Sequence, residues 1–472
     1  MIIAALVVLF HTMGFLSSIH SIMSTRTSQG AIAWAVSLNT FPYLAVPAYW
    51  VFGRSKFEGY VIARRSNDAA NDPIERQVIA SLEPFMGREA EGAEAVRAGE
   101  ALARMPVLSG NRVDLLIDGD ATFQSILEGI DQAQSYVLVQ FYIVRDDGLG
   151  RALKDRLIAK AKEGLRVYFL YDEIGSHGLA ESYKRELREA GVDIREFNTR
   201  KGRRNRFQLN FRNHRKIVVT DGRVAWIGGH NVGDEYLGKD PKFGHWRDTH
   251  VRIEGPAVLK AQISFSEDWY WATSSMPKLE WSARAAADGS DARVLVIPTG
   301  PADELESANL MFVHAINSAR KRIWIASPYF VPDHAVIVAL QLAGLRGVDV
   351  RVLIPDEPDH LAVYLAAFSY FDDAGKTGAT FYRYEDGFLH EKAMLIDDDV
   401  ATIGTANFDN RSFRLNFEVT AVVAEPSFIE DVERMFEDDF ARSRIMREGE
   451  YEEKPWYFRL GVRAARLTAP IL

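Results

Sequence analysis

The chain has 472 residues, of which 47% are hydrophobic and 26% are charged, and its formal net charge is −9. This composition is typical of a folded protein with a sizeable core and excludes a disordered chain. Because the sequence has no cysteine, it also excludes disulfides, a thiolate nucleophile and cysteine-ligated metal centres. The acidic balance argues against broad electrostatic binding of nucleic acid.

Two apolar stretches open the chain. Residues 2–23 and 31–53 contain no Asp, Glu, Lys or Arg, and each is long enough to cross a bilayer core, which needs about 20 helical residues. For the first stretch a cleaved signal peptide is the alternative, but no basic segment precedes it and a second apolar stretch follows. We therefore predict a transmembrane hairpin anchor over residues 1–57, with an interfacial or buried hairpin as the alternative.

The cations around these stretches predict the orientation. The loop between them carries only Arg26, whereas Arg54, Lys56, Arg64 and Arg65 follow the second stretch. The positive-inside rule then leaves the chain after residue 53 in the cytoplasm, as part of a multi-pass membrane protein. Residues 58–105, rich in Ala, Glu and Arg with a helical rhythm, are predicted to form a juxtamembrane connector without chemistry.

The remaining chain contains an internal repeat. Residues 130–173 and 316–357 share the order of a short amphipathic helix, an apolar strand, a longer helix and a second strand that ends in Asp-Glu. Such alternation predicts βαβ units and a largely parallel sheet that is buried on both faces. Each half later carries a helix with Phe-x-x-Asp-aromatic, at 265–269 and 436–440. We predict two similar domains, 106–285 and 286–472.

Each half also carries one polar motif that reads His-x-Lys-x4-Asp-x6-Gly-[Gly/Thr]-x-Asn. On a strand, His and Lys two residues apart point to the same face. Two copies related by a pseudo-twofold axis would converge at one cleft, as in an isologous interface. The motif residues are His214, Lys216, Asp221 and Asn231 in the first half, and His390, Lys392, Asp397 and Asn407 in the second.

This constellation is suited to phosphodiester chemistry. The two lysines and the two asparagines can hold the charge of the phosphate in a trigonal-bipyramidal transition state. One histidine attacks phosphorus, and the other protonates the leaving oxygen and then deprotonates the incoming alcohol. The His, Lys and Asp of both motifs are therefore the candidate catalytic residues, although we expect the two aspartates to tie down their local loops.

An activated histidine needs a hydrogen-bond acceptor on its other ring nitrogen. Each half offers a carboxylate on a predicted strand downstream of its motif. Asp248 follows His214 by 34 residues, and Glu418 follows His390 by 28 residues. We expect each carboxylate to orient the histidine of its own half, with a surface position as the alternative.

The paired motif is similar to that of the phospholipase D superfamily, which works through a phosphohistidine intermediate without a metal. The resemblance to the bacterial cardiolipin synthases of that superfamily extends over almost the whole chain, including the N-terminal hairpin, RNHRKIVV, HWRDTHVRIEGPAV and GTANFDNRSFRLNFEV. It implies two α-β-α sandwich domains in a pseudo-twofold unit, no cofactor, and a place in the bacterial inner membrane. It further implies His214 as nucleophile and His390 as acid and base.

The resemblance implies transfer of a phosphatidyl group from one phosphatidylglycerol to another, which gives cardiolipin and glycerol. The alternative is a membrane phospholipase D, or a phosphatidyltransferase that uses another alcohol. A nuclease is disfavoured by the acidic balance and the hairpin. A non-catalytic lipid-binding scaffold is disfavoured because both motifs are intact. The sequence leaves the oligomeric state open.

Two further segments suggest contact with anionic lipid. Residues 200–206 (RKGRRNR) hold five cations, which attract anionic membrane surfaces unless they form only a solvated loop. Residues 456–472 mix aromatic and aliphatic residues with arginines, as in an in-plane interfacial helix. Packing of this tail against the catalytic domain is the alternative.

Overall fold

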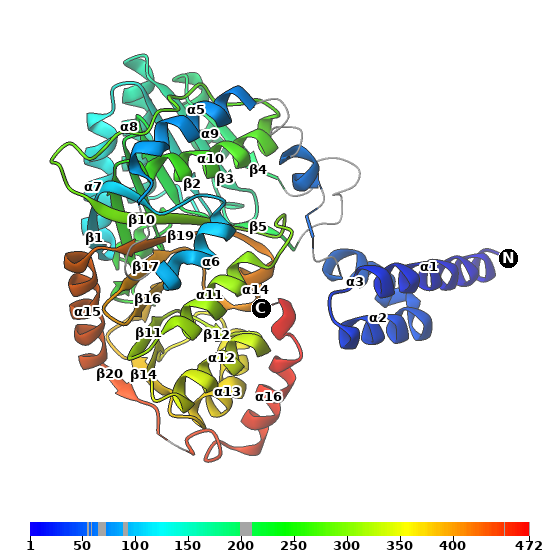
Figure 1. Ribbon diagram of the computed structural model, residues 1–472. Helices are drawn as coiled ribbons and strands as arrows, with labels where there is room; N and C mark the ends of the chain where they lie inside the picture. The colour runs from blue at the N-terminus through cyan, green and yellow to red at the C-terminus, as the bar shows by residue number, and fades with distance from the viewer. Residues whose placement is uncertain are drawn as a thin grey trace.

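The computed structural model describes residues 1–53, 56–57, 59–64, 72–87, 93–198, 210–447 and 449–471 (Figure 1). Three N-terminal helices project from a body in which two halves are stacked one above the other. The elements that precede the first half are α1 (Ile2–Ser24), α2 (Ser28–Thr40), α3 (Pro42–Phe52), α5 (Asp72–Leu82), η1 (Glu83–Phe85) and α6 (Ala93–Ala103).

The second apolar stretch is not one helix, so the transmembrane hairpin anchor predicted over residues 1–57 stays a prediction beyond its first helix. It is divided into α2 and α3 at Phe41, which has φ −138° and ψ 59°, and Pro42 is the first residue of α3. Proline disfavours the helical conformation in the residue before it, so the helix ends there. Among the described helices, α1 alone is long and apolar enough to cross a membrane.

The two halves repeat one order of elements. The first half comprises β1 (Leu108–Ile117), α7 (Asp118–Gln132), β2 (Tyr136–Phe141), α8 (Gly148–Lys162), β3 (Arg166–Asp172), α9 (Glu181–Glu189), β4 (Asp193–Phe197), β5 (Arg212–Asn213), β6 (Ile217–Thr220), β7 (Val224–Gly228), η3 (Asp234–Leu237), β8 (Trp246–Arg247), β9 (Thr249–Glu254) and α10 (Val258–Thr273). The second comprises β10 (Ala292–Thr299), α11 (Ser307–Ser318), β11 (Arg322–Ala326), β12 (Phe330–Val331), α12 (His334–Leu345), β13 (Asp349–Pro355), α13 (Leu361–Gly375), β14 (Thr380–Tyr384), β15 (Phe388–Leu389), β16 (Ala393–Ile396), β17 (Val400–Gly404), β18 (Phe408–Asp409), α14 (Asn410–Arg414), β19 (Asn416–Ala424), α15 (Pro426–Ala441), β20 (Ser443–Ile445), α16 (Trp456–Arg466) and η4 (Ala469–Ile471).

The strands form one continuous sheet in the order β20-β14-β13-β11-β16-β17-β19-β10-β1-β9-β7-β6-β2-β3-β4. Only β2-β3-β4 and β11-β13-β14 pair in parallel along this order, so the prediction of a largely parallel sheet is wrong. The motif strands turn back at once through residues in the left-handed region, such as Asp221 at φ 53° and Gly222 at φ 64°. These tight turns make β6-β7 and β16-β17 antiparallel hairpins, which an apolar run alone does not reveal.

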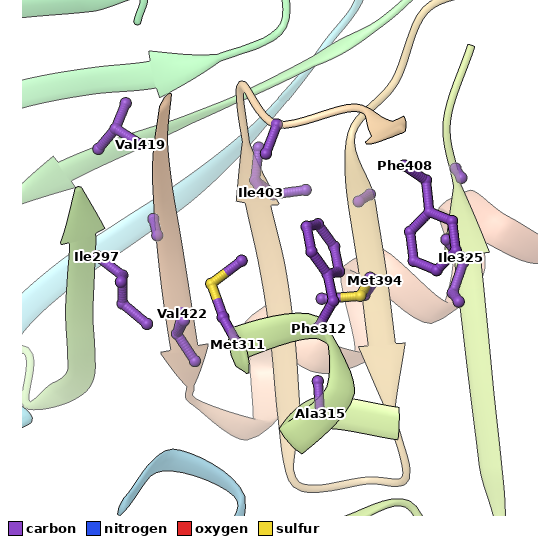
Figure 2. Close-up of a cluster of buried hydrophobic side chains, with 14 of the residues drawn as sticks. Ile297, Met311, Phe312, Ala315, Ile325, Met394, Ile403, Phe408, Val419 and Val422 are labelled. Carbon is purple, nitrogen blue, oxygen red and sulfur yellow. The ribbon is translucent and has the colours of Figure 1, made fainter. Parts of the chain in front are cut away.

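The halves meet in the middle of the sheet, where β1 and β10 pair antiparallel. Because they share this sheet, the boundaries 106–285 and 286–472 stay predictions. Helices cover both faces, and the α/β class is confirmed. Figure 2 shows Met311 and Phe312 of α11 packed over side chains of the neighbouring strands, among them Ile297, Met394 and Val422.

Part of the predicted connector belongs to the body. Phe57 and Tyr60 are 0% and 2% exposed, and both rings pack against Phe417 on β19. The Tyr60 hydroxyl donates to Asp268 at 2.7 Å, and α6 packs on β10 and α11. The segment after the N-terminal helices is thus fastened to the core beneath the strand that carries Glu418.

Candidate active site

Two short parallel bridges cross between the halves, one on each side of the pseudo-twofold axis. β5 pairs with the start of β19, and β8 pairs with β15. As a result, the His214 amide donates to the Phe417 carbonyl at 2.9 Å, and the His390 amide donates to the Arg247 carbonyl at 2.7 Å. Each motif histidine therefore lies beside the residue that precedes the carboxylate of the other half.

The carboxylates accordingly pair crosswise with the histidines. Nδ1 of His214 lies 3.0 and 2.9 Å from the two carboxylate oxygens of Glu418. Nδ1 of His390 lies 2.6 Å from Oδ2 of Asp248. The expected pairing within each half is wrong, because the register of the two bridges is a tertiary feature. Both acids are fully buried beside a motif histidine rather than at the surface.

The histidines and lysines lie in the short segments that join β5 to β6 and β15 to β16, not on the strands where they were predicted, and both lysines are buried. Lys216 Nζ donates to the His214 carbonyl at 2.7 Å, and Lys392 Nζ donates to the His390 carbonyl. Burial lowers the pKa of Lys216 to about 7 and that of Lys392 to about 8, against the opposing charges of Asp248 and Glu418. A bound phosphate would favour the charged form of both ammonium groups.

The histidines are neutral at pH 7. Burial lowers the pKa of His214 to about 4, although the adjacent Glu418 opposes the shift. Burial and the charges of Lys392 and Lys216 lower the pKa of His390 well below its usual value. A neutral ring that donates its Nδ1 proton to a carboxylate keeps its lone pair on Nε2. The site thus presents two imidazoles that can each attack or accept a proton at Nε2.

The two asparagines differ in their surroundings. Asn231 accepts at Oδ1 from the Ile143 amide at 3.0 Å and donates from Nδ2 to the Tyr236 hydroxyl at 3.1 Å, so its amide is engaged in holding the loop. Asn407 is 6% exposed, and its Oδ1 has no hydrogen-bond partner among the described residues. Phosphate binding by both asparagines stays a prediction. Fewer hydrogen bonds hold the side-chain amide of Asn407 than that of Asn231.

The motif aspartates lie at the far end of their strands from the histidines. The Asp221 carboxylate accepts from the amides of residues 134, 135 and 136 at 2.7–2.9 Å, and Asp397 accepts from the amides of residues 320, 321 and 322. These bonds hold the start of β2 and of β11. Their place among the candidate catalytic residues is therefore corrected to a structural one, which agrees with the expected loop anchoring.

Three polar side chains around Glu418 were missed by the sequence analysis. The Thr405 hydroxyl donates to it at 2.6 Å, the Ser412 hydroxyl at 2.9 Å and the Asn416 amide at 3.1 Å. Burial raises the pKa of Glu418, but His214, Lys216 and Thr405 outweigh burial, so the net shift is downward. Two signals were available: Thr405 belongs to the second motif, and Ser412 and Asn416 lie close to Glu418 in the sequence.

The middle residue of each motif and the repeated Asp of each Phe-x-x-Asp-aromatic helix form two buried ion pairs that were also missed. Arg215 donates from Nη1 to both oxygens of Asp268 at 2.9 Å. In the second motif the middle residue is the acid Glu391 instead of an arginine. The cation is supplied by Arg247 of the first half, which lies 2.8 Å from both Glu391 and Asp439. These pairs support the strands beneath the histidines. The repeated Asp was visible in the sequence, but its partner was not.

The cationic cluster 200–206 lies outside the described residues. Among the described side chains, no group of three or more His, Asp or Glu residues could hold a metal ion.

A family model described as "Cardiolipin synthase, PLD-like domain" matches residues 126–269 and 312–440. The chain belongs to this cardiolipin synthase family of the phospholipase D superfamily. Each matched segment holds one complete motif, so the family match runs through both halves. The family and the apolar helix α1 together indicate association with a membrane.

Relatives in this family align over nearly the full chain. Cardiolipin synthase A of Pseudomonas putida strain GB-1 is 50% identical over 471 residues, which are 98% of this chain and 97% of the relative. Cardiolipin synthase A of Pseudomonas fluorescens strain Pf-5 is 48% identical over 472 residues, 99% of this chain and 98% of the relative. The crystal structure of phosphatidylserine synthase from Haemophilus influenzae Rd KW20 shares the fold, with a TM-score of 0.58 at 16% identity over 80% of this chain and 100% of that one.

Proposed function

We propose that this enzyme is a phosphatidyltransferase that makes cardiolipin and glycerol from two molecules of phosphatidylglycerol. The observation that carries the proposal is the pair of buried, neutral imidazoles, each held by a carboxylate from the other half, above two buried lysines. The near-identity in length and the 50% identity to a cardiolipin synthase A support the choice of substrate.

In the first step, Nε2 of His214 attacks the phosphorus of one phosphatidylglycerol. Binding of the anionic phosphodiester favours the protonated form of His390, which takes a proton from solvent. As a phosphorus–nitrogen bond forms and the bond from phosphorus to the glycerol oxygen breaks, protonated His390 delivers its Nε2 proton to that oxygen. Lys216 and Lys392 stabilise the charge on the equatorial oxygens. Three hydroxyl or amide donors keep Glu418 anionic, so it stabilises the positive charge that develops on His214 and favours this residue as the nucleophile.

In the second step, a glycerol hydroxyl of another phosphatidylglycerol enters. His390 takes its proton, its oxygen attacks phosphorus, and the phosphorus–nitrogen bond breaks to restore neutral His214. Water in place of the alcohol would give phosphatidic acid. The anchor keeps the site near the bilayer, where the lipid alcohol is concentrated, and this proximity favours transfer over hydrolysis.

We further propose that the catalytic body lies on the cytoplasmic side of the inner membrane. The cations that follow the N-terminal helices, Lys56 and Arg64 among them, favour the cytoplasm by the positive-inside rule. There, Asn231 and Asn407 would contact the phosphate of the bound lipid in the site. The cations of residues 200–206 would be attracted to the anionic surface of the membrane.

The test uses the purified full chain and vesicles of phosphatidylglycerol. We expect cardiolipin and glycerol in equal amounts, in the presence of chelator, and loss of both products in His214→Ala. The matched control is His360→Ala, because His360 is 70% exposed at its side chain and is not a motif histidine.

The lipid products separate the alternatives. Phosphatidic acid as the main product would contradict the transferase and favour a phospholipase D. A preference for serine or another added alcohol over phosphatidylglycerol would contradict cardiolipin synthesis, while the two-histidine chemistry would stand. Activity that is lost to chelator and restored by a divalent cation would overturn the metal-free steps.

A further inference from the structure

The N-terminal helices differ in length in a way that decides how they can sit in a bilayer. At about 1.5 Å per residue, the 23 residues of α1 extend about 34 Å and match a hydrocarbon core about 30 Å thick. The 13 residues of α2 and the 11 residues of α3 extend only about 20 and 17 Å. Neither of the two shorter helices can cross the core.

The break between α2 and α3 lies beside the middle of α1. A Cβ atom on Gly14 would lie 2.2 Å from the Leu38 carbonyl oxygen and 3.1 Å from Cβ of Pro42. At the other end of α3, the Tyr49 hydroxyl lies 2.6 Å from Nδ1 of His20, near the C-terminal end of α1. The pair α2–α3 therefore runs along only one half of α1 and returns.

Both ends of this pair contact one short segment of the catalytic body. Arg26, in the turn before α2, forms an ion pair with Glu306, which also pairs with Arg414 at 3.5 Å. Lys56, after α3, donates to the carbonyl of Glu304 at 3.4 Å. Since residues 304 and 306 are two apart in the chain, the segment between Arg26 and Lys56 leaves the body and comes back to the same place (Figure 1).

We propose that α1 alone crosses the bilayer, and that α2–α3 form a re-entrant hairpin that enters and leaves on the side of the catalytic body. The end of α1 that carries Ile2 then lies on the opposite side. This arrangement puts Arg26, Lys56 and Arg64 on one side of the membrane, which satisfies the positive-inside rule more fully than two crossings do.

The helices have the side chains that this arrangement needs. The buried residues of α1 are small, namely Gly14, Ser17, Ser18 and Ser21, and small residues let membrane helices approach closely. Near the tip of the hairpin, the Asn39 amide and the Thr40 hydroxyl donate to carbonyls of their own helix at 2.8 Å. These two donors therefore have acceptors of their own inside the bilayer.

Single-cysteine labelling tests the proposal directly, because the chain has no cysteine of its own. The variants are Ile3→Cys, Ser28→Cys and, as the reference for the body, Lys239→Cys, all at exposed positions. Each is treated with a membrane-impermeant maleimide in spheroplasts and in inverted vesicles. We expect Ile3→Cys to be labelled in spheroplasts, and Ser28→Cys to be labelled only in inverted vesicles, in the same ratio as Lys239→Cys.

Two crossings would reverse the labelling of Ile3→Cys and Ser28→Cys, and that result would overturn the proposal. Labelling of Ser28→Cys from neither side would also overturn it, because the turn would then lie inside the bilayer. A second measurement uses Arg26→Cys with Glu306→Cys, which a short bis-maleimide should join. Two crossings would separate these positions by a bilayer core of about 30 Å and prevent the link. None of these readouts requires catalytic activity, so they test the membrane arrangement independently of the proposed function.

Discussion

Because Glu418 contacts His214 and Asp248 contacts His390, substitution of Glu418 should impair the nucleophile and substitution of Asp248 should impair the acid and base. A substrate with an aryl leaving group needs no proton from an acid, so only the nucleophile and its carboxylate limit the first step. We expect Glu418→Gln to slow release of the aryl alcohol by about 10²- to 10⁴-fold, because the wrong tautomer of His214 cannot attack. Asp248→Asn should slow this release far less, yet abolish the reaction with phosphatidylglycerol.

Rapid-quench measurement of the aryl alcohol compares the two variants side by side. Each serves as the control for the other, since both remove one charge from a fully buried carboxylate that contacts a motif histidine. The opposite ranking would identify His390 as the nucleophile. Equal effects would contradict a division of labour between the histidines.

The buried, neutral His214 makes stability sensitive to acid. Its pKa is about 4 in the folded chain and about 6.5 in an unfolded one. Above pH 6.5 neither state protonates the ring, whereas between pH 6.5 and 4 only the unfolded state binds the proton. The free energy of unfolding should therefore fall as the pH drops through this window, by about 3 kcal/mol for this residue.

Denaturant unfolding of the full chain in detergent, at pH 7 and at pH 4.5, measures this effect. His214→Gln should lose less stability than the parent chain over the same pH interval. The exposed His177→Gln should lose as much as the parent. An unchanged loss in His214→Gln would mean that this ring is not buried as a neutral group.

At the scale of elements, the motif aspartates are predicted to hold strands rather than to react. Asp397 is 4% exposed and accepts from three successive amides at the start of β11. Asp397→Asn turns one acceptor oxygen into a donor and leaves buried amides unpaired, which costs about 1–3 kcal/mol for each lost bond. The apparent Tm should fall clearly, while the aryl-ester rate per folded molecule stays near the parent value.

The adjacent Asp398→Asn is the matched control, since the Asp398 side chain is 59% exposed and pairs with Lys321 and Arg322 rather than with the backbone amides that Asp397 holds. Its effect on the apparent Tm should be small. A large loss of rate per folded molecule in Asp397→Asn would show that Asp397 takes part in the reaction.

The elements also show why part of the site was predictable and part was not. His-x-Lys is a local pattern, so the closeness of His214 and Lys216 followed from the spacing, although both residues lie just before β6 rather than on it. The partner of His214 is 204 residues away in sequence, and its choice depends on the register between β5 and β19. No local pattern carries that register. Likewise, the 22- and 23-residue apolar stretches look alike by charge, and only the second contains prolines, at 42 and 47; its helix breaks before the first of them.

At the scale of the whole molecule, α16 faces both the body and the surroundings. Its inner side packs on α13, where Phe458 contacts Phe368 at a ring distance of 5.2 Å and Val462 is fully buried. Its outer side leaves Trp456 and Leu460 70% and 61% exposed. The helix runs along the side of the body from which α1–α3 project (Figure 1). The packing that was the alternative for the tail is therefore observed, and its interfacial role stays a prediction.

If the outer side of α16 rests in the headgroup region, exposed apolar area and arginines should contribute to docking on anionic bilayers. We expect Trp456→Ser with Leu460→Ser to lower cardiolipin formation on phosphatidylglycerol vesicles, where the body must reach a flat surface. The same double variant should keep its activity in mixed detergent micelles, because there single lipids reach the site without docking. Ile445→Ser is the control, since Ile445 is 55% exposed on β20, far from the anchor in Figure 1. An equal loss in vesicles and micelles would show that α16 only supports the fold, because a folding defect does not distinguish between the two forms of substrate.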